Sequence, residues 1–371
     1  MILQYLKKWI DVWDYLAIDK SKNHITFYSE SKNYWSYLKN VIFELAKDTK
    51  SNLYYVTSDE NDPGLNFSHD NYKTLVIDNG YLRNWFFENL NTNLLVMTTP
   101  DLNNSQIKKS NKTNKYIYMH HALNSFSTGI NKGGLDYFDV ILCACPHQVN
   151  EIRILEKYYN LPKKDIAEVG YPRLDDLINN YHEYKNKHSK TDTKSILFAP
   201  TWGVEGLLES GGGIKIIKSL IDQNYNVILR PHPETIKHSH ECVDDIIEYF
   251  KDSNKLDIEF NICSDNSLFK SDALLTDWSG IASEYVLALK KPVLFIDTPQ
   301  KIKNPDYHKL PMISFENQMR DKWGKIWDCK SDISSLIASD INANIDGKDY
   351  VFNIGESSIA TANYLKTCLN D

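Results

Sequence analysis

A pair of histidines follows a short apolar run in the first half of the chain. The segment YIYMHHALNSFSTG places His120 and His121 where a predicted strand ends, ahead of small polar residues and Gly129. The pKa of histidine lies near neutrality, so a histidine in this position can take the proton of a hydroxyl nucleophile. We therefore treat both histidines as candidate general bases. A purely structural role is the alternative for each.

The segment NVILRPHPET places an arginine and another histidine at the end of a second apolar run. Arg230 is one of only five arginines in the chain, and Pro231 and Pro233 stiffen the backbone around His232. A guanidinium is a planar fork that can contact phosphate at two points, which the lysine ammonium cannot do. The pattern predicts that Arg230 binds phosphate in a partly exposed, electropositive pocket beside Ser279 and the helix that starts near Gly280. A structural salt bridge is the alternative.

Two further apolar runs end on small polar residues. The run ILFAPTWG ends on Thr201. The run ALLTDWSG ends on Asp277, Ser279 and Gly280, just before a predicted helix that contains Glu284. Because amide groups at a helix N-terminus suit phosphate, we expect this helix to receive one, while Glu284 reaches a ribose hydroxyl. Capping of the helix by Asp277 or Ser279 is the alternative.

The four strand ends belong to a regular alternation of apolar runs with helical stretches. Such alternation is typical of parallel βαβ units, in which ligands bind beyond the carboxyl ends of the strands. It stops in the polar, lysine-rich stretch 181–194, a candidate linker, and then restarts. A chain of 371 residues also exceeds what one core usually supports. We predict an α/β protein with Rossmann-like domains at 1–180 and 195–355, and a helix in 356–371 that crosses back to the first.

Composition limits the classes of function. The net charge of −7 argues against nucleic acid as a partner. The six scattered cysteines lack the spacing of a zinc site and fit free thiols in a reducing cytoplasm. Leu6, Trp9 and Trp13 share one face of a predicted N-terminal helix. We expect this helix to dock on its own domain, with peripheral contact at the cytoplasmic face of a membrane as the alternative.

Taken together, these segments resemble the CDP-glycerol glycerophosphotransferase family, which includes the teichoic-acid-type polymerases and primases. The matching segments occur in family order, and they are HHALNSFSTG, EVGYPRLDDL, ILFAPTW, LRPHP and LLTDWSGIASEY. The resemblance implies the GT-B fold, in which two Rossmann-like domains face each other across a cleft. Ala122 stands where the family has a glycine after its first histidine. The spacing to Gly129 makes His121 the better counterpart of that histidine, with His120 in reserve.

The resemblance also implies an activity. A polyol-phosphate, such as glycerol-phosphate, would move from a CDP-activated donor to a hydroxyl of a polysaccharide or lipid-linked acceptor, and CMP would leave. His121 would act as general base on the acceptor, and Arg230 and His232 would neutralise charge on the transferring diphosphate. The remaining candidates would bind the substrate, and they are Arg173, Thr201, Asp277, Ser279, Gly280 and Glu284. No acidic pair at metal spacing is visible, so we expect no metal and no other cofactor.

Two other classes of function remain open. The segment DWSGIASEY also leans toward the Ser-Gly-Gly-x-x-x-Glu segment of UDP-N-acetylglucosamine 2-epimerases. The chain could therefore be an epimerase or a glycosyltransferase that uses a UDP- or CMP-sugar. It could also be a non-catalytic protein of surface-polysaccharide assembly. That last role would require that the strand-end residues do not converge, whereas the enzyme reading expects His121 and His232 to face each other across the cleft.

Overall fold

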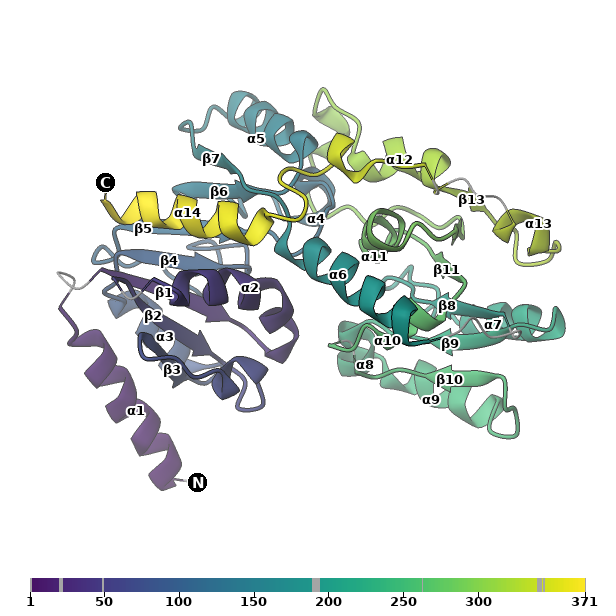
Figure 1. The fold of residues 1–371 in the computed structure, drawn as a ribbon, viewed down its shortest axis with the longest axis horizontal. Helices are drawn as coiled ribbons and strands as arrows, with labels where there is room; N and C mark the ends of the chain where they lie inside the picture. Colours follow the sequence, from purple (N-terminus) through teal and green to yellow (C-terminus); the bar gives the residue numbers. More distant parts are fainter. Residues whose placement is uncertain are drawn as a thin grey trace.

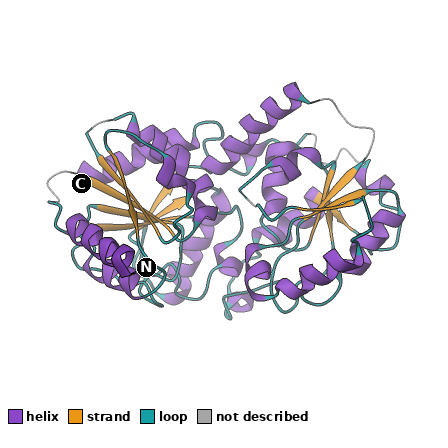
Figure 2. Cartoon of the chain, turned by 90° about the horizontal axis from the view of Figure 1, so that it is seen from below, coloured by secondary structure: helices purple, strands orange, loops and turns teal. Residues whose placement is uncertain are grey.

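The protein, a computed structural model, is organised around two parallel sheets with helices on both faces of each (Figures 1 and 2). The structure describes residues 2–19, 23–48, 50–188, 194–261, 263–338, 342 and 344–370. The first sheet has the strand order β3-β2-β1-β4-β5-β6-β7, and the second has the order β10-β9-β8-β11-β12-β13. Counted from its own first strand, each sheet begins 3-2-1-4-5-6, which is the Rossmann order. The prediction of an α/β fold with two Rossmann-like sheets is confirmed.

The first unit consists of the first sheet and the helices that cover it. Its strands are β1 (His24–Ser29), β2 (Asn52–Thr57), β3 (Tyr72–Val76), β4 (Leu94–Met97), β5 (Lys115–Met119), β6 (Val140–Cys143) and β7 (Asp165–Glu168). Its helices are α1 (Ile2–Leu16), α2 (Trp35–Ala46), α3 (Tyr81–Asn89), α4 (Phe126–Gly129), α5 (Pro146–Tyr159) and α6 (Pro172–Lys187), with short 3₁₀ turns η2 (Lys32–Tyr34) and η3 (Pro63–Asn66). The central strands are buried along their length, as expected of a parallel sheet covered on both sides.

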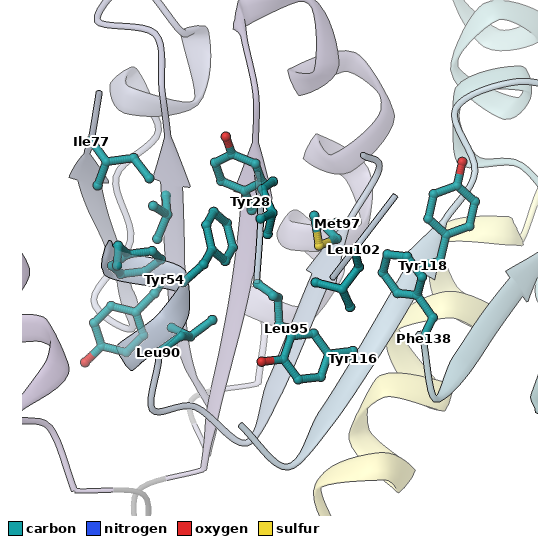
Figure 3. Close-up of a cluster of buried hydrophobic side chains, with 14 of the residues drawn as sticks. Tyr28, Tyr54, Ile77, Leu90, Leu95, Met97, Leu102, Tyr116, Tyr118 and Phe138 are labelled. Atoms are coloured by element: carbon teal, nitrogen blue, oxygen red, sulfur yellow. The ribbon is translucent and has the colours of Figure 1, made fainter. Parts of the chain in front are cut away.

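The core on one face of the first sheet is rich in tyrosine (Figure 3). Tyr28, Leu95 and Tyr116 come from neighbouring strands and lie together there. Tyr116 and Tyr118 of β5 belong to this core, whereas Ile117 between them belongs to the core on the opposite face. Packing on both faces fixes β5, and with it the residues that follow its carboxyl end.

The second unit repeats the same plan. Its strands are β8 (Ser195–Phe198), β9 (Asn226–Leu229), β10 (Leu256–Ile258), β11 (Ala273–Thr276), β12 (Val293–Phe295) and β13 (Gly324–Ile326). Its helices are α7 (Gly213–Asp222), α8 (Pro233–His238), α9 (His240–Tyr249), α10 (Asn266–Lys270), α11 (Ile281–Glu284), α12 (Phe315–Trp323) and α13 (Ser334–Ile337), with 3₁₀ turns η5 (Tyr307–Lys309) and η6 (Gly347–Asp349). A π-helical segment η4 (Tyr285–Leu289) continues α11 directly.

The C-terminal helix α14 (Ser357–Asn370) packs on the first unit, beside α2 (Figure 1). Leu365 and Cys368 are buried in the core that α2 covers. Where the chain re-enters this unit, the Asp175 carboxylate accepts hydrogen bonds from the backbone N–H groups of Gly355 and Ser357 at 2.7 and 2.9 Å. The last helix is thus held by apolar contacts and by a carboxylate of α6.

The lysine-rich stretch 181–194 is not a linker over its first part. Helix α6 continues through it to Lys187, while residues 189–193 lie outside the described part of the chain. The rings of Tyr181 and Tyr184, three residues apart on the helix, lie 5.6 and 5.5 Å from the ring of Phe269 in the second unit. This aromatic contact supports a helix where composition alone suggested an irregular segment.

Helix α1 docks along α3 but leaves one apolar side uncovered. Val12 and Tyr15 are buried, and the ring of Trp9 lies 5.1 Å from the ring of Trp85. Trp13 also contacts Trp85, with ring centroids 5.2 Å apart, but stays 60% accessible. Leu3, Leu6 and Ile10 are between 52% and 82% accessible. Among the described helices, none is both long enough and apolar enough to cross a bilayer.

Candidate active site

The predicted site residues lie at the cleft where the two sheets present their carboxyl edges. In each sheet all strands are parallel, so the residues that follow them gather at one edge. Contacts between the units hold these edges against each other. The Tyr171 hydroxyl lies 2.8 Å from Glu284 Oε1, and the Lys303 backbone N–H donates to the carbonyl oxygen of Thr128 at 2.9 Å. The strand-end residues of both units therefore converge.

His121 lies among aromatic rings on the side of the first unit. The rings of Tyr34 and Tyr37 face it edge-on at 5.3 and 5.9 Å. Its Nδ1 lies 3.3 Å from the carbonyl oxygen of Thr98, which can only accept, so Nδ1 carries the proton of the neutral ring. Burial lowers the pKa of His121 to about 4, opposed by the bond to Thr98. His121 is thus neutral at neutral pH, with Nε2 able to accept a proton.

His120 turns into the interior instead. It is 7% exposed, its Nδ1 lies 2.9 Å from the Tyr118 hydroxyl, and its ring packs edge-on against Phe126 at 4.8 Å. Burial lowers the pKa of His120 well below its usual range. The side chain is enclosed by residues of the first core, so the geometry favours His121 as the base.

His232 enters the cleft from the second unit. Its Nδ1 accepts the backbone N–H of Glu234 at 3.1 Å and thereby caps the N-terminus of α8. Because Nδ1 is the acceptor, Nε2 carries the proton of the neutral ring. The ring of Trp202 lies nearly parallel to it, with a centroid distance of 6.1 Å. Burial lowers the pKa of His232 to about 4, so this ring is also neutral at neutral pH.

His121 and His232 interact electrostatically, and their Nε2 atoms have opposite hydrogen-bonding roles. Burial is the main cause of the lowered pKa of His232, and the charges of two nearby lysines contribute. The charge of His121 contributes as well, to a smaller extent. His121 offers a proton acceptor at Nε2, whereas His232 offers a proton donor at Nε2. This arrangement can remove a proton from one group while donating a hydrogen bond to another.

Arg230 is buried rather than partly exposed. It is 9% exposed, and its Nη1 lies 3.2 Å from Ser267 Oγ and 3.6 Å from Glu259 Oε2. Glu259 directly follows β10, the neighbour of β9 in the sheet, whereas Ser279 follows β11, which lies beyond β8. The prediction of a partly exposed pocket is therefore wrong, because a carboxylate that follows the neighbouring strand lies next to Arg230. Contact of Arg230 with phosphate stays a prediction.

Arg173 is engaged across the units. It is 6% exposed near the start of α6, and its guanidinium forks onto both carboxylate oxygens of Asp265, which precedes α10. Burial opposes the charge of Arg173, but the bond to Asp265 outweighs it and raises the pKa of the guanidinium. Arg173 therefore links the units, and its predicted contact with substrate stays a prediction.

Asp277 and Thr201 bond to each other. The Asp277 carboxylate accepts the backbone N–H of Thr201 at 2.8 Å and its hydroxyl at 2.7 Å, and it also accepts the backbone N–H of Trp278 at 2.8 Å. Asp277 is 1% exposed and makes no side-chain bond to α11. It ties the ends of β8 and β11 together. The alternative role as a cap of α11 is therefore wrong, and the contact of Asp277 with donor phosphate stays a prediction.

Ser279 and Gly280 face Asn124 of the first unit. A Cβ at Gly280 would lie 3.0 Å from Asn124 Oδ1, so the missing side chain permits this close approach. Ser279 and Asn124 line a pocket between the units together with Ser283 and Arg320. Ser279 and Gly280 are thus placed where a ligand in the cleft would meet them, and their contact with phosphate stays a prediction.

Glu284 connects the second unit to the backbone of His121. The Tyr171 hydroxyl lies 2.8 Å from Glu284 Oε1 and 2.9 Å from the carbonyl oxygen of His121. Burial raises the pKa of Glu284, and the charge of Arg173 opposes that rise. Its contact with a ribose hydroxyl stays a prediction. Among the residues that the structure describes, no three His, Cys, Asp or Glu side chains form a group that could hold a metal ion.

Comparison with known proteins identifies the family. The model of the family described as CDP-Glycerol:Poly(glycerophosphate) glycerophosphotransferase matches residues 14–302, well over half of the chain. The chain belongs to this family. The resemblance predicted from the strand-end segments is confirmed.

Two curated relatives of this glycerophosphotransferase family member match part of the chain. The teichoic acid ribitol-phosphate primase of Bacillus spizizenii is 29% identical over 177 residues, which is 42% of this chain and 41% of the relative. The teichoic acid poly(glycerol phosphate) polymerase of Staphylococcus epidermidis is 27% identical over 151 residues, which is 38% of this chain and 20% of the relative. The chain thus matches less than half the length of either relative.

Solved structures share the whole fold of this family member. The wall teichoic acid polymerase TagF superposes with a TM-score of 0.61 at 18% identity, covering 100% of this chain and 96% of the other. The UDP-GlcNAc 2-epimerase from Neisseria meningitidis gives 0.58 at 12% identity, covering 94% and 100%. The UDP-GlcNAc 2-epimerase from Methanocaldococcus jannaschii gives 0.60 at 14% identity, covering 93% and 99%. The predicted GT-B fold is confirmed.

The segments that pointed to the glycerophosphotransferase family did not include the strand end after β12. There, the segment DTPQKIKN carries Lys301 and Lys303 to the same edge of the second sheet. The Lys301 ammonium lies 3.5 Å from the centroid of the Trp202 ring and donates to the Trp202 carbonyl oxygen at 2.8 Å. The two lysines just beyond the apolar run PVLFID are a feature of the sequence from which this strand end could have been predicted.

Proposed function

We propose that this glycerophosphotransferase family member transfers a polyol-phosphate from a CDP-activated donor to a hydroxyl of a cell-surface polysaccharide or lipid-linked acceptor, and releases CMP. The observation that carries the proposal is the pair of neutral histidines that different units contribute to one cleft. The Nε2 of His121 is a proton acceptor and the Nε2–H of His232 is a donor. Family membership supplies the class of donor.

The histidines suit an in-line displacement at phosphorus. The acceptor oxygen forms a bond to the phosphorus that carries the polyol, and the bond from that phosphorus to the CMP oxygen breaks, with its electron pair leaving on CMP. The acceptor proton passes to Nε2 of His121. The Nε2–H of His232 donates a hydrogen bond to a phosphate oxygen, where negative charge concentrates. Positioning and charge stabilisation of this kind supply most of the catalysis in phosphoryl transfer.

We assign the substrates to different domains. The acceptor belongs with the N-terminal domain, residues 1–180, because that domain supplies the base His121. The donor belongs with the C-terminal domain, residues 195–355, which supplies Ser279, Gly280 and His232. The segment 356–371 is the crossing helix, and the packing of α14 beside α2 supports that assignment.

Ligand-dependent melting tests the function. CDP-glycerol, CDP-ribitol and CMP should each raise the melting temperature of the protein, because a ligand at 100 times its Kd stabilises the folded state by about 2.7 kcal/mol. The larger shift of the two CDP-polyols identifies the polyol. A shift with UDP-N-acetylglucosamine and none with the CDP compounds would contradict the proposal and favour a UDP-sugar enzyme. No shift with any of them would favour a non-catalytic role in assembly.

We also propose that α1 makes peripheral contact with the cytoplasmic face of a membrane. Leu3, Leu6, Ile10 and Trp13 recur at helical spacing, so they form one continuous exposed apolar stripe. Amphipathic helices of this kind lie in the membrane interface with the apolar face inward.

Vesicle sedimentation tests this contact. The variant with Leu6→Ser and Ile10→Ser should pellet with anionic phospholipid vesicles several-fold less than the unaltered protein, because the buried apolar area sets the binding strength. A matched control is the variant with Phe260→Ser and Ile313→Ser. Those two side chains are 57% and 65% exposed, close to the 52% and 59% of Leu6 and Ile10. Equal pelleting of both variants would refute a role for α1.

A further inference from the structure

The proposed transfer requires positive charge beside the diphosphate, and both arginines among the predicted site residues are paired with carboxylates. Phosphoryl transfer places negative charge on several oxygens, which cations at the site stabilise. Arg173 is buried against Asp265, and Arg230 is buried beside Glu259 and Ser267. A cation that is not paired with a carboxylate would be better placed to meet the ligand.

The segment after β12 crosses from the second unit to the first. The Lys303 backbone N–H donates to Thr128 of α4 at 2.9 Å, in the same stretch of chain that follows the histidine pair. One residue on, Asn304 Oδ1 accepts from the Tyr159 hydroxyl of α5 at 3.2 Å. These two contacts fix the backbone of Lys303 against the first unit, beside the wall that carries His121.

The Lys303 side chain itself is exposed. Among the residues that the structure describes, neither a carboxylate nor a carbonyl oxygen pairs with its ammonium group. The neighbouring Lys301 differs, because its ammonium is held over the Trp202 ring, which in turn lies against His232. The segment thus holds Lys301 against Trp202 and leaves the Lys303 side chain exposed.

The charge of Lys303 reaches both candidate histidines. After burial, and beside the bond to Thr98, it contributes to lowering the pKa of His121. With Lys301 it also contributes to lowering the pKa of His232, again after burial. A cation whose charge acts on both rings is close enough to the two histidines to meet a donor bound between them.

We propose that Lys303 is a phosphate-binding residue of this site, and that its ammonium contacts the diphosphate of the donor between His121 and His232. A compact charge on a flexible four-carbon stem can follow phosphate oxygens as they move during transfer. Lys303 belongs to the second unit, but its backbone is hydrogen-bonded to the first. It is therefore held beside the histidines only when the two units are in contact. The inference rests on the proposed function.

Calorimetric titration with inorganic pyrophosphate tests Lys303 directly. Lys303→Met removes the charge and keeps the stem, and Lys325→Met is the matched control, since Lys325 is exposed on the edge strand β13. We expect pyrophosphate to bind the unaltered protein and the Lys325→Met variant equally, and to bind Lys303→Met about tenfold or more weakly. Equal binding by all three proteins, no binding by any, or an equal loss in both variants would overturn the inference. Melting of each variant confirms that it is folded.

Titration of the same three proteins with CDP-glycerol separates this inference from the proposed function. In one outcome, CDP-glycerol fails to bind the unaltered protein while pyrophosphate binding still depends on Lys303. That result would contradict the proposed donor and support Lys303 as a phosphate ligand. Equal CDP-glycerol binding by the unaltered protein and Lys303→Met would contradict the role of Lys303 and leave the proposed function unaffected. Loss of CDP-glycerol affinity in Lys303→Met, with cytidine affinity unchanged, supports both.

Discussion

Replacement of His121 by asparagine should reduce polyol-phosphate transfer by about 10²- to 10⁴-fold, the range that a positioned general base contributes. The asparagine amide can still donate to the Thr98 carbonyl, as His121 Nδ1 does, but it has no basic nitrogen in place of Nε2. The melting temperature should therefore change little. The measurement is the initial rate of CMP release with each candidate acceptor.

Two controls make the His121 result specific. His182→Asn changes an exposed histidine of α6 and should leave the rate unchanged. His120→Asn changes the interior histidine and should lower the melting temperature more than the rate, because His120 is packed against Phe126 and bonded to Tyr118. If His121→Asn kept the full transfer rate and His120→Asn lost it, the general base would be His120 and not His121.

The pH dependence of kcat/KM gives a second readout of the same base. Protonation of His121 removes the acceptor nitrogen, and burial lowers its pKa to about 4 from the usual value near 6.5. The rate should therefore stay level from neutral pH down to about pH 5 and fall only as the pH approaches 4. A return of the sample to pH 7 before assay separates titration from unfolding. A fall centred near pH 6.5 would contradict a buried His121 base.

Replacement of Arg230 by methionine should lower the free energy of unfolding by about 3 kcal/mol, because Glu259 would be left near the protein interior without its partner. The separation of 3.6 Å is longer than an ideal ion pair, so we take the lower end of the usual range. Denaturant unfolding of the purified variant measures the change.

A double-mutant cycle with Glu259→Gln assigns the cause. If the pair is structural, the combined variant should be more stable than the sum of the two single changes predicts, since no charge is left uncompensated. Arg230→Lys keeps the charge but loses the planar guanidinium. Its free energy of unfolding should lie between the values of the unaltered protein and Arg230→Met. A normal unfolding free energy for Arg230→Met together with lost CDP-glycerol binding would restore Arg230 as the phosphate ligand.

The sequence predicted the convergence of the site better than the direction of its side chains. Apolar runs that end on polar residues located His121, His232 and Ser279, because the carboxyl ends of parallel strands must share an edge. Arg230 also follows the carboxyl end of a strand, but its side chain lies beside Glu259 and Ser267 instead of being partly exposed. The strand next to β9 in the sheet, β10, has only three residues and none of them is buried, so the sequence did not indicate the position of Glu259.

The working nitrogens of the two histidines were also beyond the sequence. They depend on Thr98, which follows β4, and on the backbone N–H of Glu234 in α8. Neither partner is marked by residue type, since both contribute backbone groups. In the same way, Lys303 is placed by a backbone bond to Thr128 that only the closed arrangement of the units supplies.

The packing of α14 decides how the chain connects the two units. Because the first and last helices both belong to the first unit, the second unit is an insertion that the chain enters and leaves (Figure 1). The chain therefore crosses between the units twice. A single break in the backbone between the two sheets would not release the second unit, since α14 would still anchor the downstream fragment through Leu365 and Cys368. Limited proteolysis at one site should accordingly leave the two fragments together until the core beneath α14 is unfolded.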